Sequence, residues 1–334
     1  MMPPPVRIRS ELPSGDPSLL NRIAWARRWT DRTASIQNAH AARRTAVSGT
    51  GRRSRAEQGM AARTLGWQAY WKGDLDGAMS NCLSAETFLP ETEFLETRAS
   101  IYAILGLVHF SRNRADLAGC ALDRGFWLLR ETLDTAAPEA LTDLLLARAT
   151  LQRHSGERAR SGITIGRATE LAVAEQTSYV SYCTAAWLLS DGDIEEAQKH
   201  ADEGLKLAET QGNLIMLPYL HGLLGTCESS MARVDTAGLH FSKGLSIAEA
   251  EEDKRATIYL LRESAVMEKD CGNTAEATGL LMQAATLAKT TGFDFERKRV
   301  ALRLAELYEE AGDYKRSVEQ HNLAWRLQSE TRLR

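Results

Sequence analysis

The chain has 334 residues, of which 25% are charged and 43% hydrophobic, and its formal net charge is −3. This balance is typical of a globular protein and excludes a collagen-like or highly charged disordered chain. No apolar run reaches the roughly 20 residues that a membrane-spanning helix needs. The N-terminus has no secretory apolar region, and the five cysteines form no CxxC pair. These features predict a cytoplasmic protein with small buried thiols and no metal site.

The charge is unevenly distributed along the sequence. Residues 1–64 carry twelve arginines and four acidic residues, a balance of +8, whereas the remaining 270 residues balance to −11. This split permits head-to-tail self-association between a basic N-terminal end and an acidic C-terminal end. The densest basic cluster, Arg43 to Arg55, has no interleaved aromatic residues. We therefore expect a solvated loop there and not a nucleic-acid partner.

Three segments follow one another along the chain. Residues 1–17 contain five prolines and few large apolar groups, which predicts a disordered N-terminus. Residues 18–57 are expected to form a degenerate first helical hairpin and a basic loop, with small residues at Ser35, Ala39 and Ala42. Residues 58–334 are expected to form a helical repeat array that ends in a capping helix.

A turn residue recurs seven times in this array, with steps of 40, 43, 36, 40, 40 and 40 residues. The turn residues are Gly73, Asn113, Gly156, Gly192, Ala232, Gly272 and Gly312. A small residue stands five positions after each turn, at Ala78, Ala118, Ser161, Ala197, Ala237, Ala277 and Ser317. A second follows seven positions later, at Ala85, Gly125, Ala168, Gly204, Gly244, Ala284 and Ala324. A period of this length indicates a solenoid of supersecondary units.

The repeated residue types have a physical reason. Helices whose axes lie about 8–10 Å apart need small side chains where they cross. Glycine at the turn adopts the left-handed backbone that ends the first helix. The pattern therefore predicts an all-α fold of seven or eight helical hairpins. The third hairpin is the weakest copy, because Arg148 replaces leucine and the following step is short, so an irregular junction is expected after it.

The repeated pattern resembles the tetratricopeptide repeat (TPR). The resemblance covers about residues 59–331 and rests on Leu65-Gly66, the Gly312-Asp313 turn and the phased small residues. The 40-residue spacing is similar to that of sensory TPR arrays in bacterial signalling proteins, which occur with diguanylate cyclases, histidine kinases and transcription activators. The resemblance implies a right-handed superhelical solenoid whose first helices line a concave groove.

Aromatic residues at the repeat period are the candidate binding site. Tyr179, Tyr219 and Tyr259 recur every 40 residues near the start of a first helix, so they would form a ladder along the groove. Tyrosine offers a large contact area with a polar tip at low entropic cost. The predicted groove residues are Tyr179, Tyr182, Tyr219, Tyr259, Arg262, Arg63, Trp67 and Tyr70. The alternative is that these aromatic residues pack between neighbouring repeats.

Sequence motifs of catalysis are absent: there is no GxxxxGK[ST], GxSxG or HExxH. We therefore expect no catalytic residues, no metal and no cofactor. The predicted function is a non-enzymatic scaffold that binds a protein or peptide segment in its concave groove, as a regulatory or signalling adaptor. The alternative is a stand-alone sensory TPR module that binds a small effector or controls a cyclase or kinase in trans.

Overall fold

A computed structural model describes residues 15–49, 51–131 and 138–329. The described residues form sixteen α-helices and one 3₁₀ turn, with no strand among them. The helices pair into eight antiparallel hairpins: α1 (Pro17–Ala26) with α2 (Arg32–Val47), α3 (Arg52–Lys72) with α4 (Leu75–Phe88), α5 (Leu95–Ser111) with α6 (Ala115–Leu129), α7 (Pro138–His154) with α8 (Arg158–Leu171), α9 (Thr177–Asp191) with α10 (Ile194–Gln211), α11 (Leu217–Ser230) with α12 (Val234–Ala250), α13 (Lys254–Asp270) with α14 (Thr274–Thr291), and α15 (Asp294–Glu310) with α16 (Tyr314–Ser329).

The seven predicted turn residues all adopt a left-handed backbone. Five are glycines, with φ between 73° at Gly312 and 91° at Gly192. Asn113 and Ala232 take the same conformation with φ of 58° each, although they carry a Cβ. The left-handed geometry that ends the first helix is therefore present even where the turn residue is not glycine.

The repeated small residues lie where the two helices of a hairpin cross. In α10, only Ala197, Ala201, Gly204 and Ala208 are buried. A Cβ added to Gly204 would come within 2.8 Å of Ser181 in α9 of the same hairpin and of Leu220 in the next hairpin, which is closer than real contacts allow. The first helices are buried on more sides, because each also packs on the first helices of adjacent hairpins. Small residues thus set the helix spacing, and the first helices form the inner layer.

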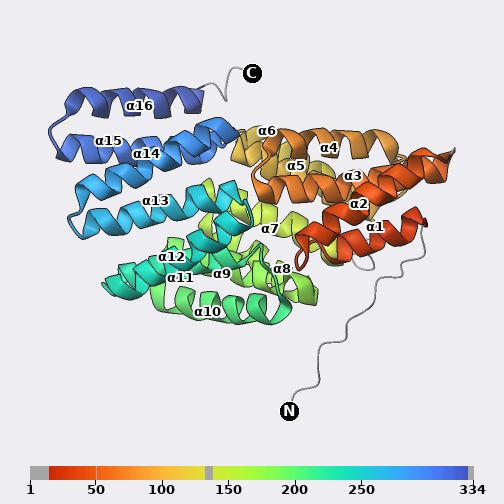
Figure 1. Ribbon diagram of the computed structural model, residues 1–334, viewed down its shortest axis with the longest axis horizontal. Helices are drawn as coiled ribbons and strands as arrows, with labels where there is room; N and C mark the ends of the chain where they lie inside the picture. Colours follow the sequence, from red (N-terminus) through yellow and green to blue (C-terminus); the bar gives the residue numbers. More distant parts are fainter. Residues whose placement is uncertain (1–14, 50, 132–137, 330–334) are drawn as a thin grey trace, which may run out of the picture.

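The hairpins wind into a superhelix (Figure 1), in which helices of the C-terminal half return to contact helices of the N-terminal half. Helix α3 contacts α13, and α5 contacts α15. Arg32 donates to the backbone carbonyl of Glu251 at 2.8 Å, and Lys72 pairs with Glu252 at 3.0 Å. The Asn113 side chain donates to the carbonyl of Leu327 at 2.9 Å. These contacts close the superhelix around its interior.

The predicted first hairpin is present as α1 and α2. Ser35 occupies its small-residue position and donates to the carbonyl of Ala24 at 2.8 Å. The expected basic loop is mostly helical, since α3 begins at Arg52 and only residues 48–51 separate it from α2. There Arg52 pairs with Glu93 at 2.6 Å, and Arg55 donates to the carbonyl of Thr87.

Other boundaries also differ in detail from the predicted ones. Of the predicted disordered segment, residues 1–17, the first fourteen lie outside the described residues, and Asp16 caps α1, which begins at Pro17. After the third array hairpin, a 3₁₀ turn (Ala174–Gln176) leads into α9. None of the described helices has the length and hydropathy that crossing a bilayer requires.

Candidate functional site

A cavity of about 430 Å³ lies inside the superhelix. Its walls come from the first helices α5, α7, α9, α11, α13 and α15, together with Ser161 and Ile165 of α8 and Phe293 just before α15. Residues from Phe110 to Arg303 therefore meet at one place. The cavity falls within the size range of small-molecule and short-peptide sites.

Four tyrosines form a continuous ladder along one wall of this cavity. The ring centroids of Tyr179 and Tyr182 are 6.4 Å apart, those of Tyr182 and Tyr219 are 5.7 Å apart, and those of Tyr219 and Tyr259 are 6.1 Å apart. Tyr182 and Tyr259 are partly exposed, whereas Tyr179 and Tyr219 are buried. The tyrosines thus lie next to one another, and Tyr182 and Tyr259 are the members with exposed surface.

The ladder also packs against the N-terminal aromatic core. Trp71 lies 5.6 Å from Tyr179 and 5.7 Å from Tyr219 between ring centroids. The hydroxyl of Tyr219 donates to the carboxylate of Asp253 at 3.2 Å. Burial raises the pKa of Tyr219, and Asp253 raises it further, so this hydroxyl stays protonated and donates. The tyrosines of this ladder therefore pack between repeats and also line the cavity.

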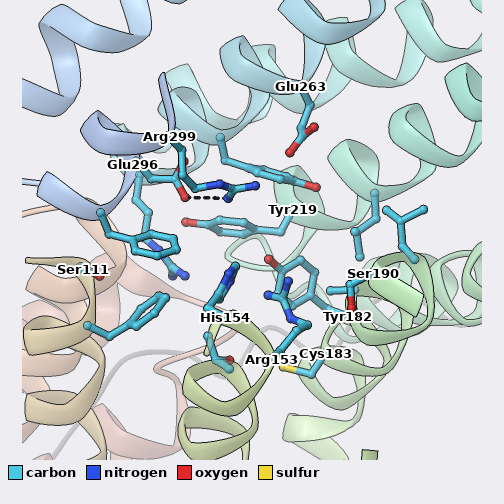
Figure 2. Close-up of a pocket in the computed structure, with 18 of the residues that line it drawn as sticks. Ser111, Arg153, His154, Tyr182, Cys183, Ser190, Tyr219, Glu263, Glu296 and Arg299 are labelled. Carbon is cyan, nitrogen blue, oxygen red and sulfur yellow. Dashed lines mark hydrogen bonds and ion pairs between the residues drawn. The ribbon is translucent and has the colours of Figure 1, made fainter. Parts of the chain in front are cut away.

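A charged wall faces the tyrosines (Figure 2). Arg262 donates to Glu296 at 2.9 Å and also pairs with Glu263, while Arg299 pairs with Glu296 at 3.2 Å. Burial raises the pKa of Glu296, but Arg262 and Arg299 outweigh it and hold that pKa at about 2. Glu296 is therefore a carboxylate at neutral pH, and it neutralises part of the arginine cluster.

An aromatic group closes the opposite side of the cavity. Phe110 stacks on His154 with centroids 5.2 Å apart and lies 4.4 Å from Phe295, so α5, α7 and α15 meet here. Burial, followed by the charges of Arg153 and Arg299, lowers the pKa of His154 to about 2. His154 is consequently neutral at physiological pH, and it contributes an aromatic face and not a charge.

Arg63, Trp67 and Tyr70 are also predicted groove residues, but none of them is among the residues that line this cavity. Trp67 and Tyr70 are 1% and 0% exposed, inside the aromatic core. Arg63 lies over the ring of Trp25 at 3.5 Å in a separate surface pocket. The first hairpin packs on α3 and covers Trp67 with Trp25 and Trp29, whereas Tyr70 is buried between Trp71 and Arg255. The prediction that these three residues line the groove is therefore wrong, and they are packing residues.

Several cavity residues were not predicted from the sequence, among them Arg153, Arg255, Glu296 and Arg299. One signal was present, since Arg299 stands 40 residues after Tyr259 and continues the tyrosine register with a cation. Arg153 and His154 had no such signal. They end α7, and His154 contacts Phe295 of α15 across the closure of the superhelix.

No model of a known protein family matches the sequence, and no curated protein matches it. Solved structures do match. A Rap protein complexed with competence and sporulation factor shares 12% identity with a TM-score of 0.71, covering 94% of this chain and 86% of that chain. The Rap conjugation gene regulator of the plasmid pLS20, in complex with the Phr* peptide, shares 12% identity with a TM-score of 0.63 and 95% coverage of both chains.

A third match is the apo form of the quorum sensor NprR from B. thuringiensis, at 14% identity and a TM-score of 0.58, covering 93% of this chain and 86% of that chain. At such identities the likeness defines the fold. The chain is an all-α superhelical solenoid of TPR-type hairpins, as the repeat pattern predicts.

Proposed function

We propose that this protein is a non-enzymatic, cytoplasmic regulatory scaffold that binds a short peptide, or an extended protein segment, in its interior cavity. The observation that carries the proposal is the cavity of about 430 Å³ lined by the tyrosine ladder and several arginines. Partly exposed tyrosines and arginines are the residue types that dominate recognition energetics. Two of the similar folds were solved with a peptide or factor bound, which supports the same use here.

The proposal is tested by affinity selection from a mixed pool of five- to seven-residue peptides, with bound species identified by mass spectrometry. We expect the wild-type chain to retain a defined subset of peptides. The substitution Tyr182→Leu keeps the apolar volume but removes the aromatic face and hydroxyl. It should weaken binding of a selected peptide by about tenfold, equivalent to about 1.4 kcal/mol.

The matched control is Tyr314→Leu, because Tyr314 is 68% exposed on α16 and does not line the cavity. It should bind the selected peptide as the wild type does. Circular dichroism checks that both variants keep their helices. Failure of the folded wild-type chain to retain any peptide would contradict the proposal.

A second candidate function is the sensing of a small effector, with control of a cyclase or kinase in trans. The observation in its favour is closure of the superhelix by Arg32 with Glu251 and Lys72 with Glu252. A closed interior is better suited to a ligand that it encloses than to a ligand that extends out of it. Thermal stabilisation by small metabolites, with no peptide retained, would distinguish this function from the first.

A further inference from the structure

The cavity carries more positive charge than its own carboxylates neutralise. Five arginines line it, namely Arg153, Arg255, Arg262, Arg299 and Arg303, against the two glutamates Glu263 and Glu296. Arg262 and Arg299 pair with these glutamates, and Arg303 pairs with Glu306 at 2.9 Å. Among the described residues of the cavity, Arg153 and Arg255 are left without an ion pair.

Arg255 is held by aromatic rings. Its guanidinium lies 4.9 Å from the ring centroids of Tyr70 and Trp71 and 5.2 Å from that of Tyr219. Its Nη1 is buried and has no hydrogen-bond partner. A buried guanidinium donor without a partner is costly, so its position here requires an explanation.

Arg153 reaches the same cavity from another first helix. It ends α7, whereas Arg255 begins α13, yet both side chains line the same cavity, and Arg255 lies over Tyr219, the ladder neighbour of Tyr182. Figure 2 shows Arg153 beside Tyr182 and Cys183. Two cations from distant parts of the sequence thus converge on the tyrosine ladder.

Like charges brought together in a partly buried cavity repel each other, and an anion between them removes that cost. Guanidinium groups present planar donors that match a carboxylate bidentately. We propose that Arg153 and Arg255 form an anion subsite that receives a carboxylate of the bound peptide, while the tyrosines contact the rest of it. This inference rests on the proposed function and specifies its ligand as a short acidic peptide.

The inference is tested with the peptide pool described above, synthesised in matched sets. One set carries glutamate and aspartate, the second replaces them with glutamine and asparagine, the third carries phosphoserine, and each set is made with a free and an amidated C-terminus. We expect the wild-type chain to prefer a carboxylate at least tenfold over its amide counterpart. The amidated sets show whether a side chain or the C-terminus supplies the carboxylate.

Two variants connect the preference to the arginines. Arg153→Gln removes a cation that pairs with no carboxylate among the described residues, and it should reduce the carboxylate preference to less than threefold while peptide binding persists. Arg255→Lys keeps the charge but not the planar fork, and it should weaken acidic peptides about tenfold. The control Arg148→Gln alters an arginine of the same helix that pairs with Asp123 outside the cavity, so the preference should stay.

The possible failures can be told apart. Peptides retained without a carboxylate preference, or with the preference unchanged in Arg153→Gln, would overturn the anion subsite but not the proposed function. A preference for phosphoserine over glutamate would overturn the assignment to a carboxylate. Retention of no peptide by the folded chain would overturn both, and acetate or inorganic phosphate binding without peptide binding would point to a small organic or inorganic anion instead.

Discussion

Residues in the left-handed backbone region mark where seven first helices end. Glycine takes this conformation without steric cost, whereas a residue with a Cβ loses roughly 1–2 kcal/mol there. Ala232 is exposed and has φ of 58°, so its strain is not offset by burial of its methyl group. Asn113 has the same φ, but its side chain also donates to Leu327 across the closure, which gives that residue a second role.

This difference predicts that Ala232→Gly stabilises the protein. Relief of the backbone strain at position 232 outweighs the conformational entropy that glycine adds to the unfolded chain. The free energy of unfolding in urea should therefore rise by about 1 kcal/mol. As a control, Ala275→Gly changes an exposed alanine with ordinary helical backbone in α14, and it should lower stability by about 0.5 kcal/mol. Equal effects of both substitutions would refute the role of backbone strain at position 232.

At the scale of helices, the spacing within each hairpin depends on glycine and alanine at the crossing. A Cβ added to Gly225 in α11 would stand 2.7 Å from the ring of Phe241 in α12. Gly238, which lies on α12 itself, has open space where its Cβ would be. The two glycines thus share one hairpin, but only the first is required by packing.

We therefore expect the same substitution to change the free energy of unfolding in opposite directions at these two positions. Gly225→Ala should destabilise the protein by about 1–3 kcal/mol, because the ring of Phe241 must move. Gly238→Ala should stabilise it by about 0.5–1 kcal/mol, because alanine is the better helix former. Urea unfolding followed by circular dichroism measures both, and a neutral Gly225→Ala would show that the crossing tolerates a methyl group.

At the scale of the whole molecule, the basic N-terminal part and the acidic C-terminal part meet within one chain. Arg32, from the basic residues 1–64, is buried, donates to the carbonyl of Glu251 and lies 3.8 Å from its carboxylate. The charge asymmetry of the sequence is thus used in part to close the superhelix. Head-to-tail association between molecules stays a prediction, which light scattering across a salt series would test.

Closure predicts a specific effect of Arg32→Gln. Losing a buried charge-assisted hydrogen bond should cost about 1.5–3 kcal/mol locally and loosen α2 from the loop after α12. Hydrogen exchange should quicken in residues 27–35 and 249–255, and the radius of gyration from small-angle scattering should rise. Arg44→Gln, an exposed change on the same helix, should leave both measurements as in the wild type.

The sequence by itself determined the hairpins, because their signals are local. Turn residues and small crossing positions act within about 20 residues of each other, so their phase predicts where each hairpin bends and packs. The tyrosine register at positions 179, 219 and 259 could be predicted for the same reason, since equivalent positions of a regular array share one face.

Only the tertiary structure decided which of these residues face the cavity. Trp67 lies on a first helix, as a groove residue should, but the hairpin α1–α2 covers it, and the repeat signals of that hairpin are weak. Arg153 and Arg255 are about a hundred residues apart in sequence. They converge because the superhelix closes, and closure depends on the summed twist of eight hairpins and on contacts between its ends, which no local pattern encodes.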